Sequence, residues 1–86
     1  MKLVKVLFFG RLREILNKDS LSIELSDDLD SVGKLRTYLA CTYGQVWEKE
    51  LNQANLVMSL NQTVVPAETA IGDGDEVAFF PPMTGG

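Results

Sequence analysis

Residues near the start of the chain are mostly apolar β-formers, and they divide into two faces with the period of a β-strand. Residues 3–9 have an apolar face that contains Val4, Val6 and Phe8. Because a strand points successive side chains to opposite faces, the remaining residues belong to a second face. That second face contains a charge, so we expect it to point away from the core. Its residues are Lys5, Leu7 and Phe9.

Four later segments also carry a strand pattern, and turn-forming residues separate them. Asn61-Gln62 predicts a turn, Pro66 ends the strand that follows, and the cluster at residues 72–75 predicts another turn. The four expected strands are residues 21–25, 56–60, 63–65 and 77–80. The side chains expected to face inward from the first two of these are Leu21, Ile23, Leu25, Leu56, Met58 and Leu60.

Helical spacing of apolar residues predicts one main helix, which begins after the N-cap residue Ser31 and ends at Gly44. Two shorter helices are expected at residues 11–16 and around Trp47 at residues 46–51. The apolar face expected for the main helix is Val32, Leu35, Leu39 and Tyr43. The inward side chains expected for the first short helix are Leu12, Ile15 and Leu16.

Strands interrupted by one main helix predict an α+β fold with a mixed sheet packed on that helix. With 86 residues, the chain is expected to form one domain over residues 1–80. Pro81 and Pro82 cannot continue a strand, and Gly85 and Gly86 offer no side chain to pack. We therefore expect residues 81–86 to be an extended, flexible C-terminal tail.

Composition narrows the chemistry that this chain can perform. It contains no histidine and one cysteine, so His-assisted nucleophiles and a thiolate metal cluster within one chain are excluded. Cys41 is expected to pack in the main helix, and Asp73 and Asp75 are explained by turn formation better than by acid–base catalysis. We expect no bound metal or cofactor.

The net charge of −4 argues against nucleic acid as a partner. All eight lysines and arginines lie at or before Lys49, so the last part of the chain is acidic. The start of the chain is too short and too charged for a signal peptide or a membrane span. Together with the single cysteine, these features favour a cytoplasmic protein with no membrane partner.

The terminal carboxylate is the most distinctive candidate group, because an apolar, uncharged tail displays it. Without Cβ atoms at Gly85 and Gly86, such a tail could enter a narrow channel of another protein. A carboxylate is a weak electrophile, so acyl chemistry at Gly86 would require activation, for example as a mixed anhydride with AMP.

The chain resembles the sulfur-carrier subunits of molybdopterin synthase, in the family of MoaD and ThiS proteins. The resemblance rests on the sequence at residues 5–9, on Asn61-Gln62-Thr63, and on the whole stretch from Gly72 to Gly86. It implies a ubiquitin-like β-grasp fold. It also implies that an E1-like adenylyltransferase uses ATP to adenylate Gly86, and that a persulfide donor then converts the glycyl adenylate to a thiocarboxylate (1-thioglycine).

In such a family the carrier itself is a non-catalytic subunit. The resemblance implies that it docks on a large catalytic subunit, as a heterotetramer of two small and two large subunits, and donates sulfur to cyclic pyranopterin monophosphate to form the molybdopterin dithiolene. The implied tail-insertion residues are Pro81, Pro82, Met83, Thr84, Gly85 and Gly86.

Strand alternation also places Phe9, Val64 and Phe80 where an exposed apolar patch could contact a partner. Three other functions remain open from the sequence. The chain could be a ubiquitin-like modifier conjugated through Gly86, a sulfur carrier for thiazole synthesis, or an interaction module with a passive tail.

Overall fold

The computed structural model describes residues 1–82, and their strands form a single five-stranded sheet in the order β2-β1-β5-β3-β4. All five strands expected from the sequence are present. Their bounds are β1 Lys2–Phe8, β2 Ser20–Leu25, β3 Val57–Leu60, β4 Thr63–Val64 and β5 Glu76–Phe80.

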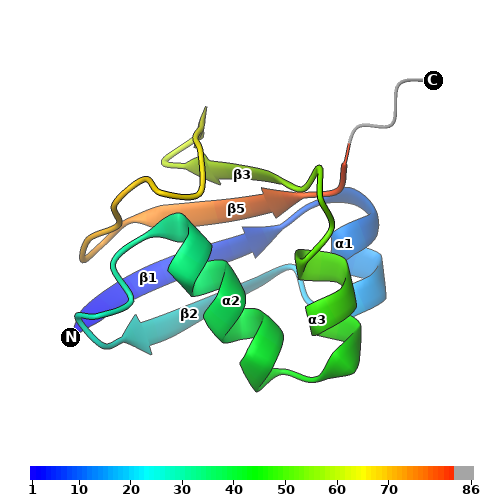
Figure 1. Cartoon of the computed structure of the whole chain (residues 1–86), viewed down its shortest axis with the longest axis horizontal. Helices are drawn as coiled ribbons and strands as arrows, with labels where there is room; N and C mark the ends of the chain where they lie inside the picture. The colour runs from blue at the N-terminus through cyan, green and yellow to red at the C-terminus, as the bar shows by residue number, and fades with distance from the viewer. Residues whose placement is uncertain (83–86) are drawn as a thin grey trace.

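The centre of the sheet joins strands from the two ends of the sequence, as Figure 1 shows for β1 and β5. These two strands run parallel, with Val6 opposite Val77 and Phe8 opposite Phe79. The pairs β1–β2, β3–β5 and β3–β4 are antiparallel. A central parallel pair flanked by antiparallel neighbours, with a helix crossing one face, is the β-grasp arrangement, so the expected α+β fold is confirmed.

Helix α2 (Val32–Thr42) crosses one face of the sheet, and the shorter helices α1 (Gly10–Leu16) and α3 (Gln45–Leu51) lie toward one end of it (Figure 1). The Ser31 hydroxyl accepts a hydrogen bond from the Lys34 amide at 3.2 Å, which confirms the expected N-cap. The residues buried between helices and sheet include Val4, Val6, Phe8, Leu12, Leu25, Leu35, Leu39, Leu51, Val77 and Phe79.

Gly33, near the start of α2, has a low helix propensity, but close packing against a neighbouring loop requires a glycine there. A Cβ at Gly33 would lie 3.1 Å from both the side chain and the carbonyl oxygen of Ala67. The Gly33 amide donates to that carbonyl at 2.7 Å, so the loop after Pro66 is held directly against the helix.

Three of the expected burial positions are wrong. Ile15 is 41% exposed and Tyr43 is 45% exposed, where both were expected to face inward. Tyr43 follows α2 as its C-cap and stacks on Trp47 at 4.6 Å between ring centroids, outside the core. Cys41 is exposed on α2 rather than packed. Each lies near a helix end, where the neighbouring elements leave the side chain uncovered.

Candidate functional site

The face of the sheet that carries no helix holds the three residues expected to form a partner patch. Phe9 is 38% exposed, Val64 is 70% exposed, and Phe80 is partly buried. The rings of Phe9 and Phe80 stack, with centroids 4.8 Å apart and planes 8° from parallel. Phe9 directly follows β1 and Phe80 ends β5, so the parallel pairing of these strands brings the two rings together.

These apolar residues surround a shallow hollow of about 320 Å³ on the open face. Ala78 and Ser59 oppose each other in the β3–β5 register, and each is only 5% exposed. Because both side chains are small, they leave a depression between larger neighbours. The residues that line this open-face hollow are Leu7, Phe9, Ser59, Gln62, Val64, Glu76, Ala78 and Phe80.

The tail begins at the edge of this same face, where β5 ends. The Phe9 amide donates to the Phe79 carbonyl at 3.1 Å, which ties the residue after β1 to the end of β5. Pro81 then lies against Gly10, because a Cβ built on Gly10 would be 3.2 Å from the proline ring. Pro81 and Pro82 also line a cleft beside α1 and α3. The other proposed tail residues, Met83, Thr84, Gly85 and Gly86, lie outside the described residues.

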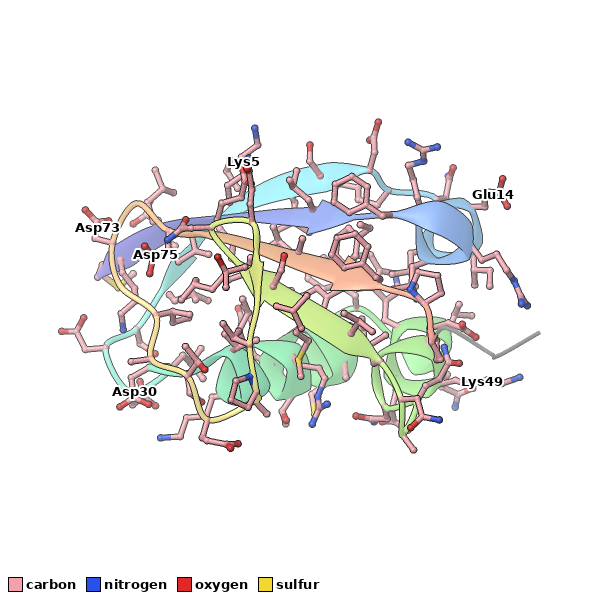
Figure 2. The ribbon with its side chains drawn as sticks, turned by 90° about the horizontal axis from the view of Figure 1, so that it is seen from above. Lys5, Glu14, Asp30, Lys49, Asp73 and Asp75 are labelled. Atoms are coloured by element: carbon pink, nitrogen blue, oxygen red, sulfur yellow. The ribbon has the colours of Figure 1, made fainter. Side chains whose placement is uncertain are left out.

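The acidic turn before β5 lies at the opposite end of the sheet. Figure 2 shows Asp73 and Asp75 at one end of the molecule, and Glu14 and Lys49 at the other. Asp73 accepts a hydrogen bond from the Leu3 amide at 2.7 Å, and Asp75 accepts one from the Gly72 amide at 2.8 Å. Both carboxylates therefore hold the turn together, as expected, and neither lines the open-face hollow.

Among residues 1–82, two ion pairs involve the loop ahead of α2, and in one of them the N-terminal ammonium lies 3.3 Å from an Asp27 carboxylate oxygen. The Lys34 ammonium lies 3.0 Å from an Asp30 carboxylate oxygen, four residues earlier. Its hydrogen bond and positive charge lower the pKa of the Asp30 carboxyl below its ordinary value. A hydrogen bond from the Ser26 side chain likewise lowers the pKa of Asp28. Asp28 and Asp30 are both exposed, so the Asp30–Lys34 pair organises a surface loop rather than a reactive centre.

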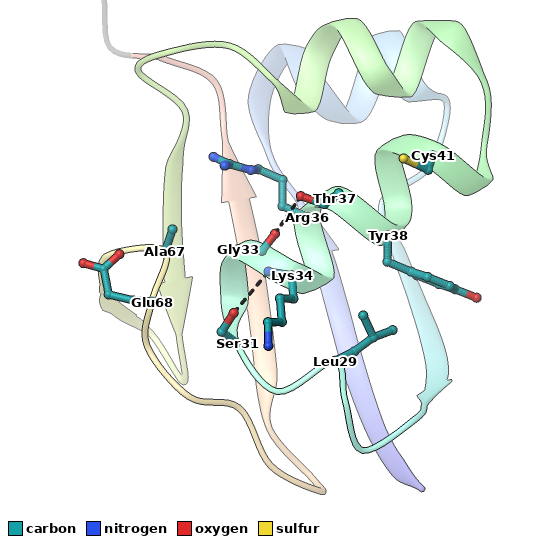
Figure 3. Close-up of a pocket in the computed structure, with 10 residues that line it drawn as sticks. All are labelled: Leu29, Ser31, Gly33, Lys34, Arg36, Thr37, Tyr38, Cys41, Ala67 and Glu68. Carbon is teal, nitrogen blue, oxygen red and sulfur yellow. Dashed lines mark hydrogen bonds between the residues drawn. The ribbon is translucent and has the colours of Figure 1, made fainter.

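A second hollow, of about 570 Å³, runs along α2 on the helical side of the molecule. Figure 3 shows Thr37, Tyr38 and Cys41 projecting from α2, with Ala67 and Glu68 on the facing loop. The Thr37 hydroxyl donates to the Gly33 carbonyl at 3.1 Å, so its hydrogen-bonding capacity is used within the helix. Mainly carbon atoms line this hollow, and it lies across the sheet from Phe9 and Phe80.

Residues 1–82 contain no group of three or more Cys, Asp or Glu side chains placed to hold a metal ion. Within the same part of the chain, none of the helices is long and apolar enough to cross a membrane.

Comparison with known proteins identifies the family. The ThiS family matches residues 6–86, which is nearly the whole sequence. The chain belongs to the ThiS family. Two curated relatives carry the name molybdopterin synthase sulfur carrier subunit. The Haemophilus influenzae protein is 42% identical over 84 residues, covering 98% of this chain and 100% of its own length. The Escherichia coli protein is 40% identical over 84 residues, with the same coverage.

A solved structure agrees with the fold of this ThiS-family chain. A chain from the complex of subunits 1 and 2 of the molybdopterin-converting factor of Helicobacter pylori superposes with a TM-score of 0.65. It is 22% identical, and the match covers 98% of this chain and 99% of that one. At this identity the likeness supports the β-grasp fold, which the strand order shows independently.

Sequence reasoning found the three large apolar residues of the patch but missed the hollow that they surround. Ala78 and Ser59 form its floor only because β3 and β5 pair in one particular register. Gln62 was read only as part of a turn, although it lines the same hollow. Its one signal in the sequence was a long polar side chain at a turn position that usually holds glycine.

Proposed function

We propose that this chain is the sulfur carrier subunit of a molybdopterin synthase, and that Gly86 is its reacting residue. The observation that carries the proposal is the match to curated sulfur carrier subunits along their entire length, at 40–42% identity. The family match also extends through Gly86, so the terminal Gly-Gly is part of the aligned sequence.

The chemistry begins with activation, because a carboxylate resists attack by nucleophiles. An E1-like adenylyltransferase transfers AMP from ATP to the Gly86 carboxylate and releases pyrophosphate. The terminal sulfur of a donor persulfide then attacks the acyl carbon, and AMP leaves. A thiol reduces the resulting acyl disulfide, and a Gly86 thiocarboxylate remains. This product is the sulfur source for converting cyclic pyranopterin monophosphate to molybdopterin.

The open face supplies the contact with a large catalytic subunit. Phe9 and Phe80 present apolar surface beside the point where the tail leaves the domain, and Val64 extends this surface across β4. A partner that covers this face therefore receives the tail directly, and six extended residues from Pro81 to Gly86 reach roughly 20 Å. We place the general acids and bases on the large subunit, which agrees with the absence of histidine from this sequence. Two carriers and two large subunits form the assembly.

We place the protein in the cytoplasm, where ATP and reduced thiols are available for this cycle. The lone, exposed Cys41 is compatible with a reducing compartment. In this proposal the carrier binds no metal or cofactor of its own, and the activating enzyme binds the ATP.

Deletion of Gly86 tests the proposal. The full-length chain, incubated with the activating enzyme, ATP and a persulfide donor, should gain the mass difference between sulfur and oxygen, and the shortened chain should not. Thermal unfolding of the two proteins should be the same. A matched control is Val46→Ala, an exposed position on α3 that should load normally.

Three results would contradict this function. Molybdopterin synthesis by the chain lacking Gly86 would show that the terminal acyl group is not the sulfur carrier. Conjugates to lysine in cells, without sulfur on Gly86, would instead identify a protein modifier. Transfer of the sulfur only to a thiazole precursor would identify the thiazole-pathway carrier.

A further inference from the structure

The β3–β4 turn places Gln62 in a backbone conformation that glutamine does not favour. Leu60 pairs with Thr63, so Asn61 and Gln62 form a two-residue turn. Their φ angles are +49° and +73°, as in the type I′ turns that such hairpins use. Positive φ is uncommon for residues other than glycine and is enriched mainly in Asn, Asp and His. Glycine would satisfy position 62 without strain, yet glutamine is present.

Asn61 has a clear structural reason to be in this turn. Its side-chain oxygen accepts from the Glu76 amide at 3.0 Å, and its own main-chain amide donates to the Glu76 carbonyl at 2.8 Å. Its side-chain nitrogen donates to Asp75 at 3.1 Å. These bonds join the turn to the start of β5. The side chain of Asn61 is therefore used within the domain.

Gln62 has no such reason. Its side chain is exposed, and no group among residues 1–82 forms a hydrogen bond with its side-chain amide. It lines the open-face hollow with Val64 and Phe80. A positive φ at a residue other than glycine, on the edge of an apolar hollow, points to a role for the side chain.

We propose that Gln62 is a specificity-determining residue of the carrier, whose amide pairs with a main-chain peptide unit of the large subunit across the open-face hollow. This inference rests on the proposed function, because it assigns that partner to the open face. A carboxamide offers a donor and an acceptor side by side, which matches the N–H and C=O of a peptide unit. A partner without that pair would leave the amide desolvated and unsatisfied against apolar walls.

The position of Gln62 suits a residue that orients the partner. Gln62 lines the hollow from the β4 side, while Phe9 and Phe80 close it from the β1 and β5 side. The apolar walls of the hollow provide contact area, but they do little to fix the orientation of a bound partner. The directional hydrogen bonds of Gln62 would set the angle at which the partner covers the face and receives the tail.

Two substitutions at position 62 distinguish the effect of the side-chain amide from the effect of the backbone conformation. Gln62→Met retains a long side chain and the positive φ but removes the amide. Gln62→Gly removes the side chain and relieves the positive φ. With the large subunit from the same organism, both variants should raise Kd by at least about tenfold, the loss expected for two hydrogen bonds. The free domain carrying Gln62→Gly, by contrast, should have a melting temperature equal to or above that of wild type.

The matched control is Asn17→Gly. Asn17 also has positive φ, +55°, as the C-cap of α1, but it does not line the hollow. It should bind the large subunit as wild type does.

Unchanged Kd for Gln62→Met would overturn the amide pairing, and a lower melting temperature for Gln62→Gly would show that glutamine serves stability. Absence of binding by wild type would refute the large-subunit assignment as well, whereas wild-type binding with both Gln62 variants unaffected would refute this inference alone.

Discussion

Phe9 and Phe80 stack on the open face of the sheet, and their immediate neighbours Phe8 and Phe79 stack on the opposite face. The outer pair has a centroid distance of 4.8 Å and the inner pair 5.9 Å. The inner rings are 1% and 0% exposed, so they belong to the core. Parallel pairing of β1 with β5 produces both stacks at once. One end of the central sheet thereby contributes one pair of rings to the core and presents the other pair on the helix-free face.

This arrangement predicts different effects for two adjacent alanine substitutions. Phe79→Ala removes a fully buried ring and should lower the free energy of unfolding by about 3–5 kcal/mol. Phe80→Ala should cost less than about 1.5 kcal/mol, because it loses mainly an aromatic stack on the surface, while weakening binding to the large subunit. Urea unfolding and a binding titration on both variants measure this. Equal losses of stability would contradict the two-face assignment.

The small residues under the hollow should matter for binding rather than folding. In Ala78→Leu the larger side chain enters the open-face hollow above Ala78, so the domain should remain folded while the hollow is filled. We expect the affinity for the large subunit to fall by more than about tenfold, since a filled hollow prevents close packing of the partner. Val46→Leu, on the exposed surface of α3, is the control and should bind normally. Undiminished affinity of Ala78→Leu would mean that the partner docks elsewhere.

The Asp30–Lys34 pair should contribute to the acid limb of the stability curve. Because the folded-state pKa of Asp30 is lowered by its hydrogen bond to Lys34 and by that positive charge, folding favours the carboxylate. The contribution is therefore present above the unfolded pKa and is lost as pH falls through the lower folded value. Asp30→Asn should reduce the loss of stability on acidification, and Lys34→Met should do the same. High salt should weaken the effect, because the pair is exposed. Identical acid titrations of all three proteins would contradict this role.

Local patterns in the sequence predicted correctly those features that depend on a single strand or helix. Alternation identified Val4, Val6 and Phe8 as core residues, because a strand with one buried face repeats every two residues. Ser31 was identified as an N-cap because its hydroxyl bonds to an amide only three residues away. Ile15, Tyr43 and Cys41 were misplaced because helical spacing does not reveal where neighbouring elements stop covering a helix.

The strands, the main helix, the tail motif and the family resemblance could all be read from the order of the residues, since each depends on neighbouring residues or on the linear sequence. The folded chain was needed to see that Phe9 stacks on Phe80, that Ala78 and Ser59 form the floor of a hollow, and that Gln62 lies at its edge. These relationships depend on strand order and register. Strand order and register are set by how the whole sheet buries its apolar face. They therefore cannot be predicted from the pattern within a single strand.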